Sequence, residues 1–344
     1  VDVWRCEADH RPWRLAWCGL AIAGLLAAGW FSRWGGDSGA TVRVGVVQTN
    51  MPQSNKMGAP FEQRLQDYRR WLDLTERLAA RADRPDVILW PETMFMGDSL
   101  NASAVAAFRD GGITYRIDPS IEIPGQPRGR LDAAWCADEL IRVQQRTGVP
   151  MLVGALATEQ LRFEPTAAGG VRPRFDRRFN SVFLVRAGAV DAERYDKMEL
   201  TPFGEMIPIL WRWPSAQQWL VSFGAAGMAF DLSFGQSPHA FNLVTGSGQP
   251  VRVVTPICFE AAFSRQCRRL VFGSGERRAD LMVNASNDGW FGPYPGGRAV
   301  HLLAARWRCV ELATPMVRAV NTGISGWIDA RGRVRATGPE GHAT

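Results

Sequence analysis

The stretch VRVVTPICFE, residues 251–260, joins an apolar, valine-rich run to a cysteine, a phenylalanine and a glutamate. Short runs of this kind predict buried β-strands. Cys258 therefore stands at the end of a predicted strand. Because unpaired cysteine is among the most buried residue types, Cys258 taken alone is better explained as a small core residue than as a nucleophile.

Similar β-rich runs recur along the chain and alternate with helical patterns. Residues 61–82 place apolar side chains at three- and four-residue intervals, which predicts an amphipathic helix, and helices are also expected at 135–146 and 299–312. The other predicted strands are VRVGVVQT (42–49), DVILWPE (86–92), MLVGALAT (151–158), NSVFLVRAG (180–188), LMVNAS (281–286), TPMVRAVN (314–321) and SGWIDA (325–330). This alternation predicts one layered α/β domain, interrupted by a long Gly- and Pro-rich excursion at 97–131.

Three chemically reactive residue types occupy the ends of separate predicted strands. Glu92 ends DVILWPE, Cys258 ends VRVVTPIC, and Lys197 follows NSVFLVRAG through an expected turn, DAERYDK (191–197). In open α/β proteins the functional groups collect at the carboxyl ends of strands, where loops leave a rigid sheet. The shared position favours a nucleophile over a core cysteine.

The composition excludes several classes of protein. The chain has 344 residues with 46% hydrophobic content, which is enough for a substantial core and argues against disorder. Its net charge of +6 comes from basic residues that are scattered along the chain, so nucleic acid is not an expected partner. The same charge predicts a mild attraction to anionic lipid. Six cysteines and four histidines show no CxxC or clustered spacing, and no GxGxxG or P-loop occurs, so no metal or other cofactor is predicted.

Near the N-terminus, LAWCGLAIAGLLAAGWF (15–31) is uncharged, bounded by Arg14 and Arg33, and carries Trp near both ends. It predicts a transmembrane helix over 15–32, with a buried globular helix or a cleaved signal peptide as alternatives. Residues 1–14 then form an N-terminal flank, which its arginines predict to lie in the cytoplasm. Residues 33–41 form a linker, and 42–344 form the catalytic domain on the outer face.

Seven segments in order resemble the motifs of the nitrilase superfamily, and closely those of its apolipoprotein N-acyltransferase branch. They are VQTNMPQ (47–53), ILWPE (88–92), NS (180–181), YDKMELTPFGE (195–205), ICFE (257–260), NASNDGWFG (284–292) and RAVNTG (318–323). The resemblance covers roughly residues 41–335. It implies a four-layer αββα sandwich.

The resemblance also implies a catalytic triad of Glu92, Lys197 and Cys258. A thiol needs a base or a nearby cation to become an efficient nucleophile, so Glu92 would take its proton and Lys197 would stabilise the anions. The backbone N–H of Phe259 would assist at the oxyanion. Structural alternatives exist for each group, because Glu92 suits a helix cap and Lys197 a solvated surface.

Glu205 in PFGE and Glu260 in ICFE are expected to support the site by orienting Lys197 or holding a substrate loop, or else to form structural ion pairs. His301 suggests a Cys–His dyad, but its helical setting favours packing or hydrogen bonding.

The implied reaction moves an acyl chain from a phospholipid, through a Cys258 thioester, to the α-amino group of a lipoprotein N-terminal diacylglyceryl-cysteine. The implied place is the bacterial inner membrane, with the catalytic domain on the periplasmic face. Aromatic residues near the motifs would form an apolar, substrate-binding wall, namely Trp211, Trp213, Trp219, Trp290 and Phe291.

Some positions depart from the family pattern. Phe259, Met57 and Val300 replace the usual Tyr, Trp and Gln, and the 97–131 insertion has no match in the family. One predicted membrane helix is present where the family has a bundle of N-terminal membrane helices. A membrane-anchored amidase that uses water as acceptor, or an inactive scaffold that binds lipid or lipoprotein, therefore remain alternatives.

Overall fold

The computed structural model describes residues 12–32, 41–52, 58–167, 170–202, 204–206, 232–273, 275–292 and 294–338. Side chains of the first range are described for residues 16–28. The chain divides into two compact units, Val1–Ala40 and Thr41–Thr344.

The N-terminal unit contains the helix α1 (Pro12–Ser32), which forms over the predicted apolar segment. Among the residues that the structure describes, no helix is both long enough and apolar enough to cross a membrane. The transmembrane span over 15–32 is therefore not confirmed and stays a prediction.

In the larger unit, the first sheet has the strand order β1-β2-β5-β8-β9. β1, β2 and β5 pair in parallel, and β8 and β9 continue the sheet antiparallel. The elements of this half are β1 (Val44–Val46), α3 (Phe61–Ala79), β2 (Val87–Trp90), α4 (Ala102–Asp110), β3 (Thr114–Arg116), β4 (Arg130–Asp132), α5 (Trp135–Thr147), β5 (Met151–Glu159), β6 (Arg162–Pro165), β7 (Val171–Arg174), β8 (Arg177–Arg186) and β9 (Ala189–Asp196).

The second sheet has the order β10-β11-β12-β13-β14-β15, with a parallel centre, β11 to β13, between antiparallel edges. Its elements are β10 (Phe241–Val244), β11 (Pro250–Val254), the short 3₁₀ helix η2 (Cys258–Ala262), α7 (Ser264–Phe272), β12 (Leu281–Ser286), the 3₁₀ helix η3 (Asp288–Phe291), α8 (Pro295–Leu312), β13 (Met316–Val320), β14 (Gly326–Ile328) and β15 (Val334–Thr337).

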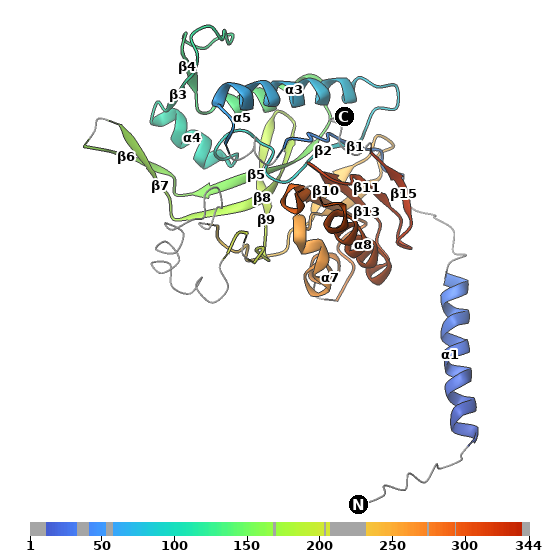
Figure 1. Ribbon diagram of the computed structural model, residues 1–344. Helices are drawn as coiled ribbons and strands as arrows, with labels where there is room; N and C mark the ends of the chain where they lie inside the picture. Colours follow the sequence, from blue (N-terminus) through green and yellow to red (C-terminus); the bar gives the residue numbers. More distant parts are fainter. Residues whose placement is uncertain are drawn as a thin grey trace, which may run out of the picture. The chain divides into compact units, whose positions relative to one another are not determined.

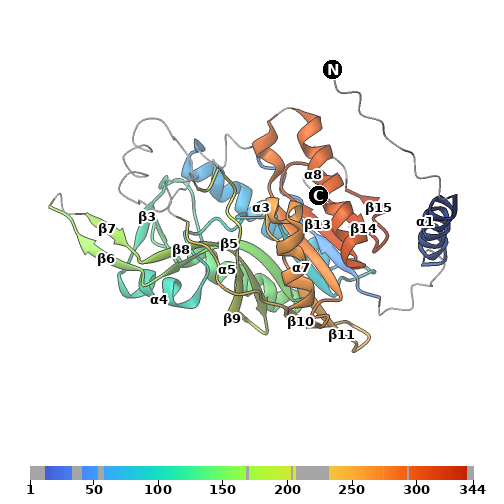
Figure 2. The same cartoon turned by 90° about the horizontal axis from the view of Figure 1, so that it is seen from below.

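Two apolar cores hold these layers together, and β2 shows how. Because side chains alternate across a strand, Ile88 and Trp90 enter the core beneath α3 and α5, whereas Val87 and Leu89 face the core shared with the second sheet. The second core also contains residues of α7 and α8. Figures 1 and 2 show α3 and α5 on one side of the paired sheets and α7 and α8 on the other. The predicted αββα arrangement is confirmed.

Three sequence-based expectations were wrong in detail. The 97–131 excursion contains α4 and the β3–β4 hairpin, since its alanine-rich segment is a good helix former. The expected turn DAERYDK is the strand β9, which reverses from β8 through Ala187 and Gly188, both at positive φ as a tight hairpin turn requires. Cys258 is not the last residue of β11 but the first residue of η2.

Candidate active site

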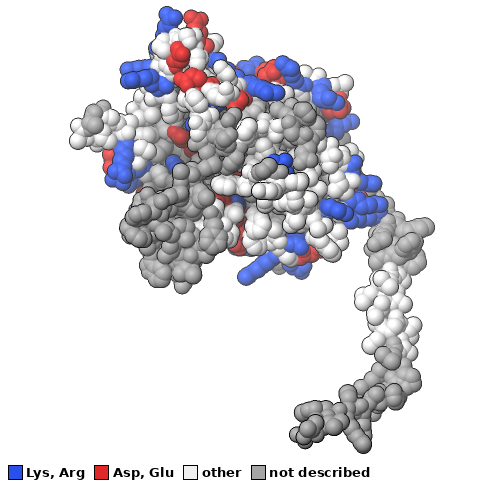
Figure 3. Space-filling view, in the orientation of Figure 1, with Lys and Arg blue, Asp and Glu red and all other residues white. Residues whose placement is uncertain are grey.

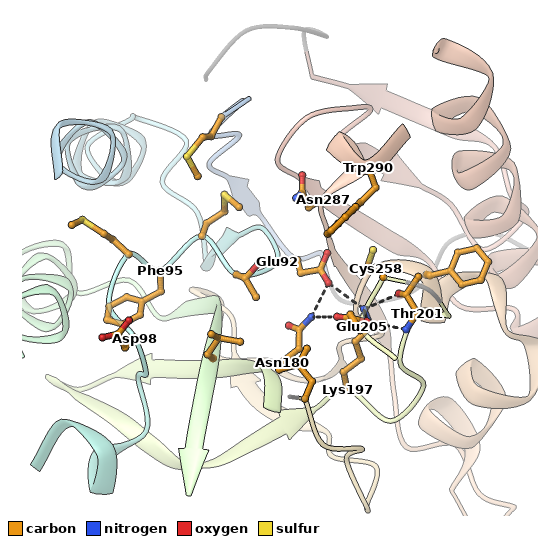
Figure 4. Close-up of a pocket in the computed structure, with 18 of the residues that line it drawn as sticks. Glu92, Phe95, Asp98, Asn180, Lys197, Thr201, Glu205, Cys258, Asn287 and Trp290 are labelled. Carbon is orange, nitrogen blue, oxygen red and sulfur yellow. Dashed lines mark hydrogen bonds and ion pairs between the residues drawn. The ribbon is translucent and has the colours of Figure 1, made fainter. Parts of the chain in front are cut away.

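The structure brings the three predicted side chains together in one pocket. Glu92 comes directly after Pro91 at the end of β2, Lys197 directly follows β9, and Cys258 begins η2. All three line a cavity of about 650 Å³. Figure 4 shows Glu92, Lys197 and Cys258 grouped with Asn180 and Glu205.

Lys197 lies at the centre of the charged groups. Its side chain is 1% exposed, and Nζ lies 2.6 Å from Glu205 Oε2 and 3.2 Å from Glu92 Oε1. Burial alone would lower the pKa of Lys197, but the two carboxylates outweigh burial and hold the pKa above its usual value. In the same way, burial alone would raise the pKa of Glu205, but the lysine lowers it. Lys197 is thus a fixed cation between two anions.

Asn180, on β8, links the two carboxylates and was missed as a site residue. Its amide nitrogen donates to Glu92 Oε1 at 2.8 Å and to Glu205 Oε1 at 2.9 Å. One amide therefore fixes the separation of the two acidic side chains around Lys197. The available signal was the NS pair at 180–181, where a polar residue opens an otherwise apolar run.

Cys258 has a strained backbone and a protonated resting state. Its φ is 50°, a left-handed conformation that is uncommon outside glycine. Removal of the sulfur from water and the charge of Glu92 raise the pKa of the thiol, and Lys197 offsets them only in part. The sulfur therefore rests as a neutral thiol, which reacts as a nucleophile when a base accepts its proton.

Glu260 holds the loops around the site. Its Oε1 accepts hydrogen bonds from the Met198 and Glu199 backbone N–H groups at 2.7 and 3.0 Å. Its Oε2 accepts one from the Ile257 N–H at 2.8 Å, and the Tyr195 hydroxyl lies 2.9 Å from both oxygens. Burial raises the pKa of Glu260 to about 7 even though these donors favour the carboxylate. The side chain joins the segment after the lysine to the residue before the cysteine.

Gly154, on β5, sets the position of Glu92. A Cβ at this residue would lie 2.2 Å from the Pro91 carbonyl oxygen and 2.8 Å from Glu92 Cα. Gly154→Ala is therefore expected to displace the Glu92 backbone and to lower turnover by about 10- to 100-fold, since small misplacements of catalytic groups have effects of this size. Overpacking should also cost roughly 1–3 kcal/mol of unfolding free energy. Initial rates and urea unfolding curves measure the two effects.

Gly296→Ala is the matched control, because a Cβ at Gly296 meets nothing within 4 Å. It should leave the turnover and the unfolding midpoint unchanged. Wild-type turnover in Gly154→Ala would show that the Glu92 position is not set by this contact.

The structure describes some of the aromatic residues that were predicted to bind substrate. Phe259, Trp290 and Phe291 line the pocket. Trp211, Trp213 and Trp219 lie outside the described residues. The pocket lining also includes Arg64, Asp98 and a set of apolar residues, namely Met51, Met94, Phe95, Met96, Leu156 and Leu232.

His301, on α8, lines the pocket but does not pair with the cysteine sulfur. Its Nε2 lies 3.1 Å from the backbone oxygen of Cys258, and Nδ1 lies 2.8 Å from Asp288 Oδ1. The expected hydrogen-bonding role is found, in place of a Cys–His dyad. Within the described residues, no group of three or more His, Cys, Asp or Glu side chains is placed to hold a metal ion.

A four-layer sandwich that presents a cysteine, a lysine and carboxylates from separate strand ends defines the nitrilase-like class of α/β proteins. The family model of carbon-nitrogen hydrolases matches residues 43–344. The chain belongs to the carbon-nitrogen hydrolase family.

Solved structures share this fold. A carbon-nitrogen hydrolase from Helicobacter pylori G27 is 12% identical with a TM-score of 0.51, over 87% of this chain and 86% of that chain. A CN-hydrolase superfamily protein from Xanthomonas campestris, whose structure contains an arsenic adduct in the active site, is 17% identical with a TM-score of 0.50, over 88% of each chain.

Curated relatives carry the name apolipoprotein N-acyltransferase. The one from Rhizobium meliloti (strain 1021) is 32% identical over 294 residues, which cover 85% of this chain and 44% of the relative. The one from Bordetella bronchiseptica (strain ATCC BAA-588 / NCTC 13252 / RB50) is 32% identical over 348 residues, and the match covers 97% of this chain and 54% of the relative. The chain spans about half the length of these relatives.

Proposed function

We propose that this chain transfers an acyl chain from a phospholipid, through a thioester on Cys258, to the α-amino group of a lipoprotein N-terminal diacylglyceryl-cysteine. The observation that carries the proposal is a cysteine beside a buried lysine and two carboxylates, in a pocket that continues into an apolar region. The charged groups suit acyl transfer, and the apolar region suits a hydrocarbon chain. The name shared by the curated relatives supports the same reaction.

In the first half-reaction, Cys258 Sγ forms a bond to the ester carbonyl carbon while its proton passes to Glu92. Glu92 suits the base role because Lys197 pairs more closely with Glu205, at 2.6 Å, than with Glu92, at 3.2 Å. The carbonyl oxygen becomes an oxyanion, which the Lys197 ammonium stabilises. The carbon–oxygen bond to the glycerol then breaks, and the lysophospholipid oxygen takes the proton from Glu92.

In the second half-reaction, the α-amino nitrogen of the acceptor attacks the thioester carbonyl carbon and loses a proton to Glu92. The carbon–sulfur bond breaks, an amide forms, and the sulfur regains a proton from Glu92. Each half-reaction returns the carboxylate and the lysine to their starting charges. Apolar walls around the thioester would limit water and favour the amine as acceptor.

An exposed apolar face on α8 supports a place at a lipid surface. Val300, Leu303, Trp307 and Val310 are exposed and recur at three- and four-residue spacing, so they share one side of the helix. Arg306, on the same helix, is also exposed. Figure 3 shows mainly uncharged side chains over α8 with basic side chains at the edges of that surface. Apolar and aromatic side chains flanked by arginine are typical of helices that lie on anionic membranes.

Trp307→Glu is expected to lower transfer from phospholipid vesicles by about 10- to 100-fold, because losing the burial of one large apolar side chain costs roughly 1.5–3 kcal/mol. Transfer from the same labelled phospholipid dispersed in detergent should change little, because no bilayer needs to be contacted. Initial rates in the two formats measure the difference.

Val171→Glu, at another exposed apolar position on β7, is the matched control and should change neither rate. An equal loss in vesicles and detergent after Trp307→Glu would indicate a damaged site. No loss in vesicles would contradict the lipid-facing role of α8.

The predicted span at 15–32 would anchor the catalytic domain to the outer face of the bacterial inner membrane. Protease added to intact spheroplasts should then cleave the domain. Protection in intact spheroplasts, with cleavage after lysis, would contradict this location.

The test of the reaction is a trapping assay with the full chain. A phospholipid with a labelled acyl chain should form a protein-bound thioester, and an N-terminal diacylglyceryl-cysteine peptide should discharge it as an amide. Ammonia release from small amides without lipid would favour an amidase instead. Lipid binding with neither activity would favour the scaffold alternative.

A further inference from the structure

A buried charged cluster beside the cysteine turn has no part in the proton transfers described above. Asp288 on η3, His301 on α8 and Arg318 on β13 are 1%, 3% and 0% exposed. Arg318 Nη2 lies 3.3 Å from Asp288 Oδ2, and His301 Nδ1 lies 2.8 Å from Asp288 Oδ1. Burying charges this deeply costs desolvation free energy unless they are paired and hydrogen-bonded in good geometry. The contacts of this cluster therefore indicate what it does.

Two side chains next to this cluster converge on one atom, the backbone oxygen of Cys258. His301 Nε2 and Asn284 Nδ2 each lie 3.1 Å from it. Asn284 is itself oriented by Arg318, whose Nε donates to Asn284 Oδ1 at 3.2 Å. The amide nitrogen of Asn284 is then left to donate to the Pro256 oxygen at 2.9 Å and to the Cys258 oxygen at 3.1 Å. The contacts through His301 and through Asn284 therefore both end at the Cys258 carbonyl.

The Cys258 carbonyl fixes the direction of one hydrogen bond at His301. A backbone oxygen only accepts, so Nε2 must donate. Burial alone would raise the pKa of Asp288, but the hydrogen bond from His301 and the charge of Arg318 outweigh it and lower the pKa. The other ring nitrogen, Nδ1, lies 2.8 Å from Asp288 Oδ1 and 3.2 Å from Arg318 Nη2, so these two side chains hold the imidazole ring in place.

Holding this oxygen also fixes the next N–H group. In a trans peptide the C=O and N–H bonds point in opposite directions, and the described peptide bonds include none that is cis. The Phe259 N–H must therefore point away from His301 and Asn284. It lies in the first turn of η2, where the backbone N–H groups precede the first intrahelical acceptor.

We propose that His301, held by Asp288 and Arg318, acts with Asn284 as a positioning device that turns the Phe259 N–H toward the carbonyl oxygen of the acyl group on Cys258. The inference rests on the acyl chemistry of the proposed function, but not on the identity of the donor or acceptor. It also explains how the strained φ of Cys258 is maintained, since two hydrogen bonds hold the peptide that follows it.

The test compares two reactions of the same sulfur in the full chain. Acylation by p-nitrophenyl butyrate passes through an oxyanion, whereas alkylation by iodoacetamide does not. His301→Ala is expected to slow the acylation burst by about 10- to 100-fold, less than the loss of a whole oxyanion donor, and to leave the alkylation rate in alkaline buffer within about twofold. The loss should appear in the maximal burst rate and not in the ester concentration that gives half of it.

His301→Gln places an amide donor near the same carbonyl and should recover most of the burst rate, which also covers the case in which the alanine variant folds poorly. His239→Gln, at a partly buried histidine that packs edge-to-face against Phe241, is the matched control and should change neither reaction. Equal losses of acylation and alkylation, or an unchanged burst in His301→Ala, would overturn the proposal. No burst in the wild type would overturn both proposals, whereas a wild-type burst without acylation from phospholipid would overturn only the proposed function.

Discussion

Cys258→Ala is expected to abolish the protein-bound thioester and to lower transfer by at least about 10³-fold, because loss of the nucleophile in a covalent mechanism removes the route itself. The fold should remain intact, since Cys258 is only partly buried, lines the pocket and packs at the edge of the second apolar core. Mass spectrometry of the protein after exposure to labelled phospholipid, with the rate of amide formation, measures both effects.

Cys18→Ala is the control for this experiment, because Cys18 is an exposed free thiol that non-specific acylation would reach. That variant should keep the full thioester yield and the full rate. Label that persists in Cys258→Ala and disappears in Cys18→Ala would show that the trapped adduct is not a catalytic intermediate.

The fold was predictable in segments where the pattern of apolar residues in the sequence matches the pattern of buried side chains. β2 was found because it is a short, continuous apolar run that ends at Pro91, and α3 because its apolar side chains recur at helical intervals. β9 was missed because it is an edge strand with exposed charged residues, so DAERYD reads as a turn. α7 was missed for a similar reason, since arginines surround its few buried residues.

The candidate site was predictable in its reactive groups but not in their support. Strand ends and motif order pointed to Glu92, Lys197 and Cys258, which the structure brings together. Arg318 gave a signal of its own, because a charged residue inside an apolar strand must find a buried partner. A single sequence could not show that the partner is Asp288, since the two residues lie 30 positions apart, on η3 and β13, and meet only in the folded chain.

Glu92→Gln is expected to lower thioester formation by about 10²- to 10⁴-fold, the range for removal of a general base. The glutamine oxygen can still accept the hydrogen bonds that Lys197 and Asn180 donate to Glu92 Oε1 at 3.2 and 2.8 Å, so the geometry should persist. What is lost is the capacity to take the thiol proton. Because the pKa of Cys258 is raised, the resting thiol supplies little thiolate to compensate. Burst kinetics with labelled phospholipid, with thermal unfolding as the check on folding, measure the effect.

Glu205→Gln tests whether Glu205 acts as the counter-ion of Lys197 while Glu92 acts as the base. Without Glu205, the ammonium of Lys197 would pair with Glu92 alone, which leaves the Glu92 carboxylate less free to accept the thiol proton. Glu92 would remain in place, so thioester formation should fall by about tenfold, far less than in Glu92→Gln. A larger loss in Glu205→Gln than in Glu92→Gln would exchange the two roles. Glu205, which lies closest to the lysine, would then be the group that accepts the thiol proton.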